Sequence, residues 1–217
     1  IKTNLKTTIT LCLLGCILSA QAQSYLGLRG GVNFANVPTT EDGGITKERI
    51  AGAIAGLYFD VKVNDKIAIQ PEFNYVQKGF VRVVGKPFHY VYRLNYLEWN
   101  VLFKYRISNI NNSVKKKKRI NAYLLAGPYY GWAFSGKRKN RVLDTTDDEV
   151  FHFVKRGDTG LIGGGGIERP MGVGGNLIID IRYNFGILPI DDWNLYDGKI
   201  KNHGILITVG YAFQLGR

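Results

Sequence analysis

Cysteine is nearly absent from this chain, and its two copies stand where they add nothing to a folded domain. Cys12 and Cys16 both precede residue 23, inside a segment that reads as an export signal. Once that segment is removed, the mature chain has no cysteine, which excludes disulfide bonds, a thiolate zinc site and a cysteine nucleophile. Acidic residues are also scarce, because 17 Asp and Glu stand against 29 Lys and Arg, for a net charge of +12.

A hydrophobic run long enough to form a transmembrane helix is missing as well. The apolar stretch over residues 7–18 is the best candidate, and a helix needs about 20 residues to cross the hydrocarbon core. No segment sustains the 3.6-residue period of an amphipathic helix. The composition is therefore not that of a helical bundle. It is not that of a disordered chain either, because aromatic residues are abundant.

The first residues have the order expected of a signal peptide. A basic start with Lys2 and Lys6 precedes the apolar stretch, and Ala20-Gln21-Ala22 provides a small-x-small cleavage site. We therefore predict a cleaved signal peptide over residues 1–22 and one mature domain over residues 23–217. Leu13-Leu14-Gly15-Cys16 also resembles a lipoprotein acylation box, so lipidation at Cys16 stays open as an alternative.

The rest of the chain is rich in the residues that short strands and tight turns use. It contains 27 Gly, 13 Tyr, 11 Phe and 3 Trp. From Ala51 to Val63 every odd position is apolar, whereas the even positions are mostly small or polar, which is the alternation of a half-buried strand. About eight segments alternate in this way, each near the ~10 residues of a tilted membrane strand. These segments span residues 25–34, 51–63, 67–78, 97–107, 120–134, 158–168, 176–185 and 204–214.

The connections between these segments alternate in length. The connections at 37–49, 135–157 and 187–202 are long, and those between them at 64–66 and 169–175 are short. Bacterial outer-membrane barrels combine long outer loops with short periplasmic turns. This asymmetry favours the membrane barrel over a soluble one.

The polar face of each segment is predicted to line the barrel interior. The apolar faces carry almost no charge except Arg93, and an Arg or Lys at the bilayer midplane costs about 2–4 kcal/mol. Most strand glycines lie on the polar face, where a narrow interior needs small residues. We therefore predict a closed, antiparallel, up-and-down transmembrane β-barrel, all-β, of about eight strands. A soluble lipocalin-like ligand-binding barrel, with an apolar interior, is the alternative. The aromatic girdles expected at the two membrane interfaces are Phe34, Tyr75, Trp132, Phe134 and Phe185 outside, and Phe59, Phe103, Tyr105, Tyr211 and Phe213 on the periplasmic side.

Charged residues on the polar faces form a candidate network in the lumen. Buried charges need partners, and the two signs are nearly balanced here. We expect a salt-bridged plug that fills the barrel, with a proton or solute path as the alternative. The predicted network consists of Arg29, Asp60, Lys62, Glu72, Glu98, Lys104, Arg106, Asp158, Glu168, Asp180 and Arg182.

Several segments resemble the PorT-like family of outer-membrane β-barrels, common in Bacteroidota. The resembling segments are Gly27–Phe34, Tyr96–Tyr105, Ala122–Tyr129, Gly160–Glu168 and Ile179–Gly186. Asn100 departs from the family pattern, which usually has a proline there. The resemblance implies an integral outer-membrane barrel. The family's namesake is tied to type IX secretion and gliding, a role that most members are not assigned.

Two basic clusters are candidate contact sites. Lys115, Lys116, Lys117, Lys118 and Arg119 lie in the connection 108–118 and just after it, which is long for a periplasmic turn. They form either a solvated turn near headgroups or a docking site for an acidic periplasmic protein, such as part of a secretion or motility machinery. The second cluster, which we place in the largest outer loop, is expected to contact lipopolysaccharide phosphates and comprises Lys137, Arg138, Lys139 and Arg141. The compartment argues against nucleic acid as a partner.

No catalytic arrangement is evident. His89, His152 and His203 fall in or beside predicted outer loops, but none is paired with a serine at a catalytic spacing, and Ser135 is the only serine in the large outer loops. We predict no enzyme activity, no cofactor and no metal site. The expected role is structural support or interaction in the cell envelope. The alternative is a lipid-modifying enzyme active at the barrel rim.

Overall fold

The computed structural model describes most of the chain from Ser24 to Leu215. The described residues are 24–36, 45–84, 88–107, 120–140, 143, 145–147, 150–152, 154–171, 174–190 and 201–215. The predicted signal peptide over residues 1–22 and the basic turn at Lys115–Arg119 lie outside them. No helix in the described ranges is long and apolar enough to cross a membrane.

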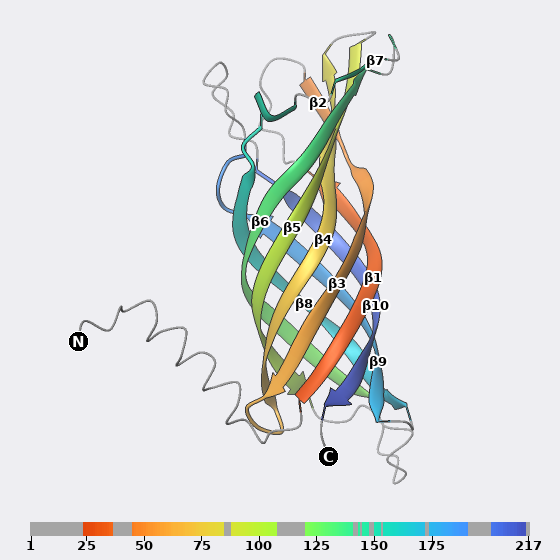
Figure 1. The fold of residues 1–217 in the computed structure, drawn as a ribbon, viewed down its shortest axis with the longest axis vertical. Coiled ribbons are helices and arrows are strands. Elements are labelled where there is room, and N and C mark those ends of the chain that lie inside the picture. Colours follow the sequence, from red (N-terminus) through yellow and green to blue (C-terminus); the bar gives the residue numbers. More distant parts are fainter. Residues whose placement is uncertain are drawn as a thin grey trace, which may run out of the picture.

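Eight strands close into an antiparallel barrel (Figure 1). The first strand, β1, pairs with β3 on one side and with the last strand, β10, on the other; for example, Gly30 lies opposite both Ala55 and Val209. This closure confirms the predicted barrel and its strand count. The barrel strands are β1 (Ser24–Asn36), β3 (Ile50–Lys62), β4 (Ile67–Val84), β5 (Phe88–Ile107), β6 (Asn121–Asn140), β8 (Gly157–Met171), β9 (Gly175–Gly186) and β10 (His203–Leu215).

The two ends of the barrel differ. At the lower end in Figure 1, both ends of the described barrel meet, with Ser24 opposite Leu215. The turn between β3 and β4 lies there too, and the Asn64 side chain holds it by accepting hydrogen bonds from the backbone nitrogens of Lys66 (2.9 Å) and Ile67 (2.8 Å). Short turns mark the periplasmic end of an outer-membrane barrel.

At the upper end, β4, β5 and β6 rise above the other strands and carry short additions (Figure 1). Strand β2 (Ile45–Glu48) pairs with the top of β4, and β7 (Thr145–Asp147) pairs with the top of β6. A 3-10 turn, η2 (Val150–His152), follows. The outer end is therefore a sheet extension, not only a set of loops.

This extension corrects the prediction of one long outer loop over residues 135–157. Strand β6 continues to Asn140, because the upper half of β5 offers it a partner as far as Tyr90. Lys137, Arg138 and Lys139 therefore lie on a strand, where their backbone is fixed. The period-two pattern is obscured there by a register shift opposite Asn95 and Tyr96, where β6 carries one extra residue, Phe134. Beyond it the outward positions of β6 change from even to odd numbers.

The two faces of each strand differ in polarity. Large apolar side chains are exposed on the outer wall, among them Val101 (55%) and Ile181 (57%), whereas the polar residues of the same strands are buried inside. An apolar exterior suits lipid, and a polar interior does not suit a lipocalin-like lumen. The soluble-barrel alternative is thus wrong.

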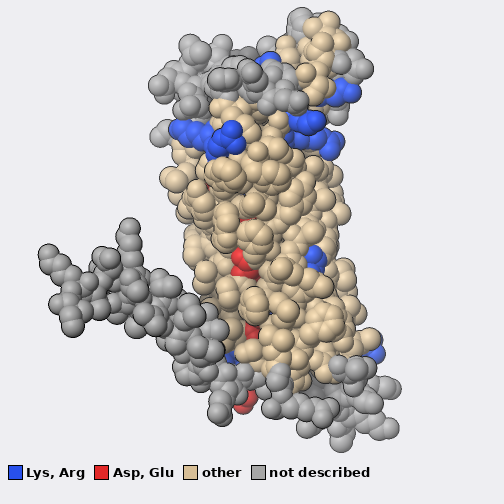
Figure 2. All heavy atoms as spheres, viewed as in Figure 1, with Lys and Arg blue, Asp and Glu red and all other residues tan. Residues whose placement is uncertain are grey.

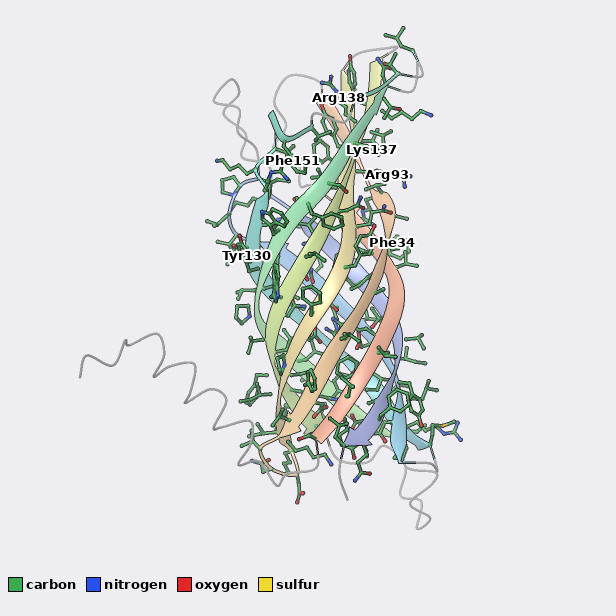
Figure 3. The ribbon with its side chains drawn as sticks, viewed as in Figure 1. Phe34, Arg93, Tyr130, Lys137, Arg138 and Phe151 are labelled. Carbon is green, nitrogen blue, oxygen red and sulfur yellow. The ribbon has the colours of Figure 1, made fainter. Side chains whose placement is uncertain are left out.

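Aromatic side chains lie on the outer wall where the girdles were predicted. Neighbouring rings contact one another, as in Tyr75–Phe134 (6.2 Å between centroids) above and Tyr211–Phe213 (4.8 Å) below. All ten predicted girdle residues belong to the outward face of their strands. Tyr130, which the prediction did not count among the girdle residues, joins them, and Figure 3 shows it with Phe34 on the wall.

Candidate functional site

The lumen holds its charges at three levels, each built from several strands. The lower level joins Asp60 of β3, Lys104 and Arg106 of β5 and Glu168 of β8. Lys104 Nζ lies 2.8 Å from Asp60 Oδ2 and 2.9 Å from Glu168 Oε2. Arg106 bridges the same two carboxylates, at 2.7 Å from Asp60 Oδ1 and 3.1 Å from Glu168 Oε1. Two cations and two carboxylates are therefore fully cross-linked.

The middle level centres on Glu72 of β4. Arg29 Nη1 and Arg182 Nη1 donate to its Oε1 at 2.9 and 2.8 Å, and Arg182 also forms a two-bond pair with Asp180 at 2.8 and 2.9 Å. Asn100 Nδ2 donates to Glu72 Oε2 at 2.8 Å. Here too two cations meet two carboxylates. Asn100, which stands where the PorT-like pattern has proline, thus supplies a hydrogen bond that proline has no side chain to make.

The upper level contains a residue that the predicted network omitted. Lys78 of β4 lies with its Nζ 2.8 Å from both Glu98 Oε2 and Asp158 Oδ2. Asp158 also accepts hydrogen bonds from Tyr129 (3.2 Å) and Asn202 (3.0 Å). Lys78 shares the inward parity of Glu72 and Asn74 on the same strand, so the alternation alone contained the signal. This level has two carboxylates on one cation.

The structure places the predicted network residues on the inner face, but Lys62 stands apart from the three levels. Its side chain lies at the lower mouth, half-buried, with Nζ 5.1 Å from the centre of the Tyr25 ring. The other network members are all buried. Lys62 is therefore a residue of the mouth and not of the plug.

Apolar and aromatic side chains fill the space around the levels. In the lower half, Lys104 Nζ lies 4.1 Å from the centre of the Tyr123 ring, and in the upper half Lys78 Nζ lies 4.5 Å from that of Tyr129. Above the upper level, side chains from the extension and the loops form a buried apolar cluster over the mouth. This cluster contains Phe80, Tyr92, Leu94, Tyr96, Ala133, Val150, Val154 and Ile190.

Inward glycines make room for these large side chains. A Cβ on Gly27 would lie 2.0 Å from Cζ of Tyr58, and a Cβ on Gly56 would lie 2.0 Å from Asn74 Oδ1. That Asn74 oxygen accepts a hydrogen bond from Arg29 (2.9 Å). The glycines of the polar face are thus required by packing, as the narrow interior predicted.

Basic residues gather at the upper end of the wall, on the face shown in Figure 2, and we call them the basic rim. Figure 2 shows Lys and Arg gathered there, while the wall below carries few charged atoms. Arg93 of β5 lies directly opposite Lys137 of β6, and both are exposed on the outward face together with Lys139 (Figure 3). Arg138 lies 5.8 Å from the centre of the Tyr90 ring. Arg141 of the predicted lipopolysaccharide cluster lies outside the described residues. Arg93 was not part of that predicted cluster and was noted only as the charged exception on the apolar faces.

Comparison with known proteins identifies the family. A family model for the outer membrane protein beta-barrel domain matches residues 20–192. The chain belongs to this family. Among curated proteins, no sequence matches it.

Solved barrels share the fold at low sequence identity. Neisserial surface protein A is 11% identical with a TM-score of 0.53, over 88% of this chain and 97% of that one. OprG of Pseudomonas aeruginosa is 12% identical with a TM-score of 0.54, over 90% of this chain and 97% of that one. The family and these neighbours support an outer-membrane location. The PorT-like assignment within the outer membrane protein beta-barrel family stays a prediction.

Of the three histidines of this outer-membrane barrel, only His203 has a described side chain. His203 Nδ1 lies 3.0 Å from the Tyr183 hydroxyl, and its ring meets Phe185 edge-on at 4.8 Å. The side chains of His89 and His152 lie outside the described set. Ser135 accepts a hydrogen bond from Asn95 at 2.8 Å. Within the described part of the chain, no group of three His, Cys, Asp or Glu side chains is placed to hold a metal.

Proposed function

We propose that this protein is a non-catalytic, sealed outer-membrane barrel whose basic rim binds phosphate groups of lipopolysaccharide in the outer leaflet. The observation that carries the proposal is the pair Arg93 and Lys137, which stand opposite each other on the outward face. Two cations side by side on one outward face offer several hydrogen-bond donors to a single anionic group. A guanidinium beside an ammonium suits a phosphate.

The height of the pair supports a headgroup ligand. Lys137 follows the wall aromatic Phe134 by three residues on β6, about 10 Å along the strand. Aromatic belts mark the level of the headgroups, so a cation one step above them meets the phosphates and not the acyl chains. Lys139, two residues further along the same face, extends the basic surface outward.

The sealed lumen supports the non-catalytic part of the proposal. Each of the three levels crosses the barrel through salt bridges, and an apolar cluster covers the upper mouth. Such a structure holds the barrel rigid and presents its outer surface. A structural or interaction role in the envelope follows.

The test is lipopolysaccharide binding by the barrel in nanodiscs. Purified lipopolysaccharide and the same material after removal of its phosphates are titrated against the wild type and the variant Arg93→Gln/Lys137→Gln. The matched control is Lys66→Gln, an exposed lysine in a turn at the opposite end. We expect the double variant to bind intact lipopolysaccharide at least about tenfold more weakly, which corresponds to the loss of about one charge-assisted hydrogen bond at the low end of its range. Equal binding by all three proteins, or no effect of phosphate removal, would overturn the proposal.

A further inference from the structure

Several buried polar atoms between the middle and upper levels have no partner among the described residues. They are Glu98 Oε1, Asn100 Oδ1 and both amide atoms of Asn184, while Glu98 Oε2 meets only Lys78. Tyr58 Oη and Arg106 Nη1 also have no hydrogen-bond partner there, but they stand apart from this group. Glu98, Asn100 and Asn184 are at most 2% exposed. Buried polar atoms are almost always satisfied by protein, water or an ion. An unexplained group of such atoms therefore points to something bound among them.

These atoms belong to one slice of the barrel. Asn100 and Arg182 both bond Glu72, which places β5 and β9 at a common level there. Glu98 is the next inward residue above Asn100 on β5, and Asn184 is the next above Arg182 on β9. Each stands about 6.6 Å further along its strand. The two unpartnered side chains thus face the same slice, just above Glu72.

The charge of the upper level supplies an independent reason for a ligand. The lower and middle levels each pair two cations with two carboxylates, whereas Lys78 alone faces both Glu98 and Asp158. Their side chains are at most 4% exposed. Asp158 accepts hydrogen bonds from three donors, Lys78, Tyr129 and Asn202. Glu98 is paired through Oε2 alone, with Lys78. The excess negative charge is therefore located at Glu98, and an uncompensated buried charge is strongly disfavoured.

We propose that a monovalent cation, such as sodium, binds in this slice of the lumen. Its ligands would be Glu98 Oε1, Asn100 Oδ1 and Asn184 Oδ1, which are hard oxygen donors of the kind that alkali and alkaline-earth ions prefer. One positive charge balances the level, and a divalent ion would leave it positive. The Asn184 amide nitrogen then donates to a water in the shell of the ion. The inference does not depend on the proposed function of the rim.

The first test is direct and uses the unaltered protein. The barrel is refolded and crystallised in a thallium(I) salt, so that the ion is present before the lumen closes, and anomalous differences are measured. We expect a peak bonded to Glu98 Oε1 and Asn184 Oδ1. Water density without an anomalous signal, or no density at all, would overturn the proposal.

The second test measures stability as a function of the cation. The refolded barrel is melted at constant ionic strength in sodium chloride and in choline chloride, because choline is too large for a filled lumen. We expect the melting temperature to be several degrees higher in sodium, and the difference to vanish in Glu98→Gln. The control variant Asp65→Asn, in an exposed turn, keeps it. Equal melting temperatures in the two salts would overturn the proposal, as would a Glu98→Gln variant that keeps the full difference.

Discussion

The lower and upper halves of the barrel differ in how well their buried charged side chains are paired. Below, Lys104 and Arg106 each bridge Asp60 and Glu168, so cations and carboxylates balance. Above, one lysine serves two carboxylates, and Asn184 has no partner in the described part of the chain. In the lower half each cation bridges both carboxylates, and the charges balance although Arg106 Nη1 has no hydrogen-bond partner among the described residues. The upper half has one carboxylate in excess and side-chain atoms without partners. We assign ligands to this half: a cation inside the lumen and lipopolysaccharide at the rim.

The largest expected effect comes from breaking the middle level, which joins the halves. Glu72→Ala leaves Arg29 and Arg182 buried without their shared carboxylate. Removing one partner of a buried ion pair costs about 3–5 kcal/mol. We expect the midpoint of urea unfolding in detergent to fall accordingly, or the folded band on an unheated gel to disappear. Asp65→Asn is the exposed control, and an unchanged midpoint for Glu72→Ala would contradict the plug.

A smaller effect is expected from filling the space of an inward glycine. Gly27→Ala places a methyl group against the Tyr58 ring, and overpacking of this kind costs about 1–3 kcal/mol. The same urea titration measures it. The outward Gly30, whose Cβ would meet nothing closer than 3.7 Å, is the matched control. If Gly27→Ala and Gly30→Ala are equally mild, the lumen is less tightly packed than we describe.

The smallest effect distinguishes the rim from the plug. Without lipopolysaccharide, Arg93→Gln should change the stability of the barrel by no more than about 0.5 kcal/mol, because the side chain is exposed. With lipopolysaccharide the same substitution should destabilise the barrel, because a phosphate contact is lost. Melting temperatures in detergent with and without the lipid measure both. An equal effect in the two conditions would show that the pair does not hold a phosphate.

The alternation of apolar and polar residues was sufficient to predict the barrel and which face of each strand points into the lumen. Leu57 and Phe59 face lipid and Tyr58 and Asp60 face the lumen, as the period of two requires. The upper extension was harder to predict, because an extra residue on β6, Phe134, breaks the period of that strand and made residues 137–139 look like a loop. Pairing inside the lumen could not be read from the sequence at all. Arg182 and Glu72 are separated by 110 residues, and only the closed barrel brings them together.

The most direct test of the central claim is conductance of the purified barrel in a planar lipid bilayer. We propose that the salt-bridged levels and the apolar cluster in the upper part of the barrel close the lumen to the flow of ions. We predict that the wild-type protein inserts without producing current steps under applied voltage, at both polarities. Reproducible steps of one size, present with the wild type and absent from a protein-free bilayer, would show an open path and contradict the sealed lumen.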